Sequence, residues 1–320
     1  MKTLRKVFCK IAILKLAVVF TLLAGCYVVP ETGRQSLVLI DEATEMRMGL
    51  QAYSQALTDQ KIARNSKYSP AVQRVGSRIA AVANQPNYQW EFTLFDAPDT
   101  VNAWCLPGGK IGIYTGLFRV VKNEAQLAFV TGHEVGHAVA KHGAERMSHQ
   151  LLLVVGAEVV AAAMEDKTKE EQENKENIER VRVAYGIGSA LFVMLPFSRK
   201  HEYEADRIGL MYMADAGYDP REALILQESF IEYHKQKGGG TPEYLSTHPT
   251  DVKRLVEMKT LLPQAMQRYY RATGQMPPNA DEAGISAGST NDIPTATIRQ
   301  GSKNNRSKKS FTGVKMEDEE

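Results

Sequence analysis

The stretch His133-Glu134-Val135-Gly136-His137 decides the fold of this chain. On a helix, its two histidines lie four residues apart and project from one side, so they can share a metal ion, with Glu134 beside them as a candidate base. The surrounding sequence favours a helix. Asn123 can cap its first turn, Gln126 lies at the capping-box position, and the pattern continues to about Gly143. The stretch therefore predicts a helix that carries two ligands of a metal site.

A third ligand must come from elsewhere, because a hydrolytic zinc ion needs three protein ligands and one open position. The best source is the segment His201-Glu202-Tyr203-Glu204-Ala205-Asp206. Glu202 and Asp206 lie on one helix face, so one can bind metal while the other holds a ligand histidine through its second ring nitrogen. Glu204 is expected to point away. The alternative, which the spacing leaves open, is that Glu202 and Asp206 are surface charges.

A small sheet is predicted before the motif. Tyr88, Trp90, Phe92 and Leu94 alternate with polar residues, which is typical of a strand with one buried face. In the segment 102–116, the sequence Pro107-Gly108-Gly109 indicates a turn that closes a hairpin.

Apolar residues at helical spacing predict further helices. The first is capped by Asp41 and should bury Ala43, Met46, Leu50, Tyr53 and Leu57. The second begins with Ser69-Pro70 as cap and first turn, and should bury Val72, Val75, Ile79 and Val82. Three more are expected over residues 201–216, 220–234 and 250–262.

Two other apolar segments, residues 151–164 and 183–197, flank a highly charged stretch over residues 165–180. Both are shorter than the roughly 20 residues of a spanning helix. We expect buried helices of a bundle, with membrane contact as the alternative, and a solvated charged stretch between them. After about Thr273 the composition is typical of a disordered tail.

The first residues predict an export signal. Basic residues precede and flank an apolar run over residues 16–24, which ends in Leu23-Ala24-Gly25-Cys26. This ending is typical of a lipoprotein signal peptide, so we expect cleavage before Cys26 and acyl chains that anchor the mature chain to a membrane. A short retained membrane anchor is the alternative. Tyr27 is not the aspartate that commonly signals inner-membrane retention, so the expected location is the periplasmic face of the outer membrane.

Charge and cysteine content agree with export. The signal peptide contains five of the 39 Lys and Arg residues and none of the 37 Asp and Glu residues, so the mature chain is weakly acidic. Nucleic acid is therefore not an expected partner. Cys9 is removed and Cys26 is lipidated, so Cys105 has no partner for an intrachain disulfide. The oligomeric state is left open.

Four motifs in order resemble a known family. They are the VNAW to YTG segment at 101–116, HEVGH at 133–137, EYEAD at 202–206, and Ser246-Thr247-His248-Pro249 followed by Arg254. Over roughly residues 32–262 the chain resembles the gluzincin metallopeptidase family of the CAAX prenyl protease and HtpX, in particular its bacterial lipoprotein and mitochondrial quality-control branches. This implies an α+β, mainly helical zincin-type domain with a small hairpin beside the active-site helix. The expected organisation is a signal peptide (1–25), a lipidated tether (26–40), this domain (41–272) and a tail (273–320).

The resemblance also implies roles for individual residues. His133, His137 and Glu202 would bind one zinc ion, Glu134 would be the catalytic base, and Asp206 would support a ligand. His248 and Arg254 match positions that approach the active centre from the C-terminal side.

Other residues near these motifs have weaker assignments. If His248 reaches the open side of the metal, it could stabilise an oxyanion; a structural role before Pro249 is the alternative. Trp104 and Cys105 depart from the family pattern, and an inert buried thiol is expected at Cys105. The remaining histidines are expected to lie at the surface or in packing: His142, His149, His201 and His234.

The expected function is a zinc-dependent endopeptidase that cleaves misfolded or unassembled envelope proteins, although a dedicated processing enzyme fits equally. An extended substrate would pair with the hairpin edge over residues 102–114, with Asn102, Ala103 and Gly109 as substrate-binding residues. The alternative is a non-catalytic lipoprotein that holds polypeptides in the same groove. The intact Glu134 argues against it, because a binding module needs no base beside its metal.

Overall fold

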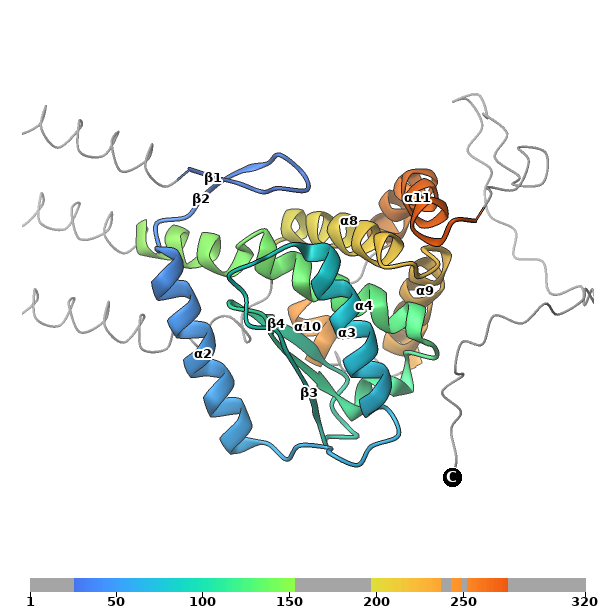
Figure 1. Cartoon of the computed structure of the whole chain (residues 1–320), viewed down its shortest axis with the longest axis horizontal. Coiled ribbons are helices and arrows are strands. Elements are labelled where there is room, and N and C mark those ends of the chain that lie inside the picture. Colours follow the sequence, from blue (N-terminus) through green and yellow to red (C-terminus); the bar gives the residue numbers. More distant parts are fainter. Residues whose placement is uncertain (1–25, 153–196, 237–242, 249–251, 276–320) are drawn as a thin grey trace, which may run out of the picture.

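The computed structural model describes residues 26–152, 197–236, 243–248 and 252–275 (Figure 1). These residues confirm the predicted α+β class, with helices around a small sheet. The predicted signal peptide, most of both apolar segments, the charged stretch between them and most of the tail lie outside the described residues. Among the described helices, none has the length and apolar character that crossing a membrane requires.

Two helices form the centre of the domain. α4 (Glu124–Val139) packs most extensively against α8 (Arg199–Asp215), and Figure 1 shows α4 between α8 and the sheet. α3 (Ser69–Ala83) packs on α4. α9 (Arg221–Gln236) also packs on α4, α11 (Val252–Thr273) packs on α8, and α9 and α11 pack against each other. Nearly every residue of α4 is buried, so the HEVGH motif lies in the core.

The sheet has the order β3-β5-β4. β4 (Ala103–Leu106) and β5 (Lys110–Tyr114) are antiparallel, which confirms the predicted hairpin. β3 (Glu91–Phe95) is parallel to β5. A short 3-10 helix, Thr115–Arg119, leads from β5 toward α4.

Both faces of the sheet are covered, so the prediction of one buried face on the first strand was wrong. Leu94 packs with the core formed by α3 and α4. Phe95, which points to the opposite face, lies with Trp104 and with Tyr53 of α2 (Glu42–Asp59). The alternating pattern of the strand did not reveal its second buried face, because α2, far away in sequence, covers that face with apolar residues.

α2 is capped by Asp41 as predicted, since its Oδ1 accepts the Thr44 amide at 2.9 Å. The predicted apolar stripe is wrong in part, because Leu50 is 54% exposed whereas Met48 and Gly49 are buried. A Cβ at Gly49 would stand 2.2 Å from the Pro107 carbonyl oxygen. The helix therefore presses its Gly49 side against the β4–β5 turn, and this rotates Leu50 toward solvent.

Two other helix boundaries differ from the prediction. α3 has Tyr68, not Ser69, at its N-cap, and the Ser69 hydroxyl donates instead to the Ala63 carbonyl at 3.0 Å. α11 continues through Pro263 to Thr273, eleven residues beyond the predicted end at 262. The burial of Ala265 and Met266 accounts for this continuation.

The segment expected as a tether contributes to the domain. β1 (Cys26–Val28) and β2 (Gln35–Leu37) form an antiparallel hairpin. Val29 between them is fully buried, and the Tyr27 hydroxyl donates to the Val139 carbonyl at 2.7 Å. The hairpin is therefore fastened to the C-terminal end of α4.

Candidate metal centre

The ends of α4 place the motif residues. The side chain of Asn123 accepts the Gln126 amide at 2.9 Å, as predicted. The Gln126 side chain accepts the Lys122 amide, whereas a capping box requires the amide of the next residue, Asn123. The helix ends at Val139 instead of near Gly143, because Lys141 is in the left-handed conformation with φ 54°. A new helix begins at residue 142.

Glycines let α4 and α8 approach closely. A Cβ on Gly209 of α8 would lie 2.7 Å from the His133 backbone nitrogen, and one on Gly132 would lie 3.0 Å from the Gly209 oxygen. No larger residue fits this crossing without a shift of backbone. The close contact allows Glu202 and Asp206 of α8 to reach His133.

Three side chains converge with the spacing of metal ligands. His133 Nε2 lies 3.1 Å from His137 Nε2, and Glu202 places its two oxygens 3.5 Å and 3.4 Å from these nitrogens. Ligands of a tetrahedral zinc ion, each bound at 2.0–2.1 Å, stand about 3.3 Å apart. The three residues therefore fit one zinc ion, and all three are buried.

His248 stands at a fourth ligand position. Its Nδ1 is 3.3 Å from His133 Nε2 and 3.1 Å from Glu202 Oε1, and single ligand atoms of all four residues lie within 4.8 Å of one another. From the sequence, His248 is an oxyanion stabiliser if it reaches the open side of the metal, with a structural role as the alternative. In this structure it does stand on that side, at the fourth position.

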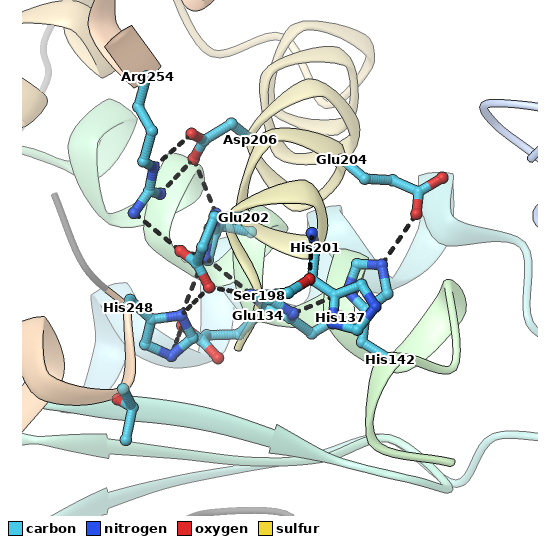
Figure 2. A network of polar contacts seen from close by, with 12 residues as sticks. Glu134, His137, His142, Ser198, His201, Glu202, Glu204, Asp206, His248 and Arg254 are labelled. Atoms are coloured by element: carbon cyan, nitrogen blue, oxygen red, sulfur yellow. Dashed lines mark hydrogen bonds and ion pairs between the residues drawn. The ribbon is translucent and has the colours of Figure 1, made fainter. Parts of the chain in front are cut away.

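Asp206 and Arg254 support the ligands from behind (Figure 2). Asp206 Oδ1 is 3.0 Å from His133 Nδ1, which leaves Nε2 facing the metal position. Burial works to lower the pKa of His133, but its bonds to Asp206 and Glu202 prevail and raise the pKa to about 9. Burial works to raise the pKa of Glu202, but His248 and Arg254 hold it well below its usual range.

Glu134 has the environment of a base. Its side chain is buried, and burial raises its pKa toward the range in which a carboxylate accepts a proton usefully. Its Oε1 has no hydrogen-bond partner among the described residues and lies 3.5 Å from His248 Nε2. Tyr244, which the sequence interpretation missed, stacks on His248 with ring centres 4.6 Å apart, and its hydroxyl works to lower the pKa of Glu134. The sequence signal that could have identified Tyr244 was its position four residues before His248.

A cleft opens beside the metal position. Asn102, Ala103 and Cys105 of the β4 segment line it together with Glu134, His137 and Phe197. The predicted substrate residue Gly109 does not line it: Gly109 closes the β4–β5 turn, and its carbonyl accepts the Glu91 amide. Cys105 is only partly buried, unlike the buried thiol expected, although desolvation raises its pKa well above the usual value.

His142 lies in packing, one of the two places expected for it, but its contacts are specific. It is fully buried, its Nδ1 lies 2.8 Å from His137 Nδ1, and its Nε2 lies 2.9 Å from Glu204 Oε2. Glu204 does point away from the metal position, yet it is buried, with a 7% exposed fraction. The break at Lys141 brings His142 beside His137, and helical periodicity alone gives no sign of it. His149 is exposed, as expected.

Comparison with known proteins gives a consistent result. Residues 66–262 match Peptidase family M48. The chain is similar to the mitochondrial metalloendopeptidase OMA1 of Arabidopsis thaliana, with 36% identity over 72% of this chain and 42% of the relative. The Schizosaccharomyces pombe protein of the same name is 32% identical, over 74% of this chain and 66% of its own length.

A bacterial relative is also similar. The Escherichia coli K12 beta-barrel assembly-enhancing protease is 25% identical over 76% of this chain and 50% of its own length. The chain thus spans between 42% and 66% of the length of these relatives. The matched region contains the HEVGH helix, the EYEAD helix and His248. The resemblance seen in the motifs is confirmed, and the chain belongs to Peptidase family M48.

Proposed function

We propose that this protein is a zinc-dependent endopeptidase that cleaves misfolded or unassembled proteins of the cell envelope. One observation carries the proposal: His133, His137 and Glu202 converge at the spacing of tetrahedral zinc ligands, with the buried carboxylate of Glu134 beside them. A metal and an adjacent base are the two parts that peptide hydrolysis by activated water requires.

The side chains have distinct tasks in this reaction. Zinc held by the three ligands would polarise the scissile carbonyl and acidify the attacking water. Glu134 accepts the proton of that water and passes it to the leaving amine. His248, whose ring lies 3.5 Å from Glu134 beside the metal position, would stabilise the oxyanion.

The substrate lies along β4. This strand is at an edge of the described sheet, and Ala103 and Cys105 on its cleft side stand next to Glu134. Main-chain pairing at a strand edge recognises extended polypeptide with little regard to sequence. Unfolded chains are therefore the substrate class that this site fits.

The expected location supports the same substrate class. The lipoprotein ending at Cys26 favours an anchored envelope protein, and one relative is named a beta-barrel assembly-enhancing protease. We propose the periplasmic face of the outer membrane as the site of action.

A non-catalytic lipoprotein that holds polypeptides in the cleft is the second candidate. The observation that favours it is His248, which completes a set of four protein ligands. Closed sets of four are typical of structural zinc sites.

Glu134→Gln separates the two candidates. The protease proposal expects near-stoichiometric zinc and a loss of casein cleavage of about 10²–10⁴-fold, because only proton transfer is removed. Glu257→Gln, an exposed position on α11, is the matched control. Equal complementation of a deletion strain by Glu134→Gln and wild type would support the holding role instead, and a comparison of protein N-termini between the two strains would identify substrates.

A further inference from the structure

We propose that the β1–β2 hairpin helps to position the metal ligand His137. Arg34 of the hairpin, Glu204 and His142 form a chain of hydrogen bonds that ends at His137. The inference rests on the assignment of His137 as a zinc ligand. It assigns a positioning role to the segment that immediately follows the expected lipidation site at Cys26.

The chain of contacts starts in the hairpin. Arg34 Nε donates to Glu204 Oε2 at 2.5 Å, and the Thr32 hydroxyl donates to Glu204 Oε1. The other two guanidinium nitrogens of Arg34 donate to both oxygens of Glu145 at 2.9 and 2.7 Å. Two carboxylates from different helices thus hold one arginine, and this arginine fixes the orientation of Glu204.

The chain continues from Glu204 to the metal ligand. Glu204 Oε2 is 2.9 Å from His142 Nε2, and His142 Nδ1 is 2.8 Å from His137 Nδ1 (Figure 2). The opposite nitrogen of His137, Nε2, faces the metal position. His137 is therefore held on the side that the metal does not use.

Proton placement along the chain follows from the hydrogen-bonding capacity of each group. An ionised carboxylate only accepts, so His142 Nε2 carries a proton and donates to Glu204. The neutral His142 ring then has a bare Nδ1, which accepts from His137 Nδ1. With its proton on Nδ1, His137 presents a bare Nε2, which is the form that binds metal.

The two histidine ligands are therefore supported in different ways. Asp206 holds His133 directly, whereas Glu204 holds His137 through His142. Because His142 is fully buried, water cannot replace it, and its removal would leave a buried N–H of His137 unpaired.

The hairpin is built to hold this position. Tyr27, the residue after Cys26, bonds to the carbonyl of Val139 at the end of α4, and Val29 is fully buried. Lys141 bonds to Glu45 and lies over the Tyr27 ring. A short stretch of polypeptide thus joins the expected anchor at Cys26 to Arg34, and the hydrogen bonds from Arg34 lead to the metal ligand His137.

The test measures zinc affinity of the full-length protein by competition with a chelator, together with the melting temperature of the metal-free form. His142→Leu should weaken zinc binding about 10–100-fold, the usual cost of losing such a supporting partner. His142→Asn, whose side-chain oxygen can stand near the position of Nδ1, should bring the affinity back to within about threefold of wild type. Arg34→Met should show a smaller loss in the same direction as His142→Leu.

Matched controls separate this role from a general effect of the substitutions. His149→Leu lies on the same helix but is exposed, and Arg64→Met changes an exposed arginine; both should bind zinc as wild type does. If His142→Leu does not fold, His142→Phe, which keeps a planar ring without nitrogen atoms, replaces it in the comparison.

Two results would overturn the proposal. The first is wild-type zinc affinity in His142→Leu, whether or not the melting temperature of the metal-free form is lowered, and the second is an equal loss of affinity in His142→Asn. Wild-type affinity in His137→Ala would instead remove the ligand assignment, and with it the proposed protease function. Loss of casein cleavage is not used as a readout, so the two failures are distinguishable.

Discussion

Arg254 holds both oxygens of Asp206, with its Nε 2.7 Å from Oδ2 and its Nη2 2.6 Å from Oδ1. Its third nitrogen, Nη1, lies 2.8 Å from Glu202 Oε2. One buried guanidinium therefore balances both carboxylates that α8 sends toward the metal. It is supplied by α11, which begins only a few residues after His248.

Arg254→Gln should lower the free energy of unfolding of the metal-free protein by about 3–5 kcal/mol, because two buried carboxylates would lose their counter-charge. Chemical denaturation measures the change. Arg271→Gln, an exposed position on the same helix, should stay within about 0.5 kcal/mol of wild type. A similarly small effect at Arg254 would contradict the proposed charge balance.

His133→Ala, His137→Ala and Glu202→Ala should each lose zinc and proteolysis, because three protein ligands are needed for a hydrolytic site. Zinc content by metal analysis and casein cleavage are the measurements. From the sequence alone, Glu204→Ala should keep both properties. Because Glu204 bonds to His142 in the structure, we instead expect Glu204→Ala to bind zinc more weakly and to keep only residual activity. Full activity in Glu202→Ala would show that the wrong carboxylate has been chosen.

His248→Ala should retain zinc on the remaining three ligands and lower kcat by about 10²–10³-fold, the usual cost of removing a group that stabilises an oxyanion. Steady-state cleavage of a peptide and zinc content give the two readouts. Faster turnover in this variant would mean that His248 only blocks the fourth position.

Gly209→Ala should separate α4 from α8, because the added Cβ would meet the His133 backbone nitrogen at 2.7 Å. We expect a loss of stability of about 1–3 kcal/mol and weaker zinc binding, measured by denaturation and chelator competition. Gly132→Ala, whose nearest contact is 3.0 Å, should show the same effects to a smaller degree. Unchanged zinc binding in Gly209→Ala would show that the close crossing is not required for the site.

Cys26→Ser should convert a membrane-bound protein into an unprocessed or mislocalised precursor, because acyl chains need the thiol. Cell fractionation and the mass of the N-terminal peptide give the result. Replacement of residues 1–26 by a cleavable signal without a lipid site should release a soluble, active protein. If that product still floats with membranes after a high-salt wash, the apolar segments at 151–164 and 183–197 contact lipid.

Several local features of the fold were predicted correctly, although the Ser69 cap was not, and contacts between distant segments could not be predicted. The Asp41 and Asn123 caps and the β4–β5 turn depend on residues close together in sequence, and they lie where predicted. The exposure of Leu50 depends on how α2 meets the β4–β5 turn. That contact joins residues about 58 positions apart, and helical periodicity does not report it.

The sequence by itself determined the pair of ligands on α4 and the shared face of Glu202 and Asp206, because a helical period places residues four apart on one side. The spacing did not say which of the two carboxylates binds metal. The family resemblance implied Glu202, and the tertiary structure places Glu202 at the metal position and Asp206 against His133, a contact between residues 73 positions apart. It also decided that His248 fills the fourth position and that His142 and Arg34 support His137. These contacts depend on the glycine-lined crossing of α4 and α8, the backbone break at Lys141 and the burial of the hairpin, and no spacing within one segment encodes how separate segments meet.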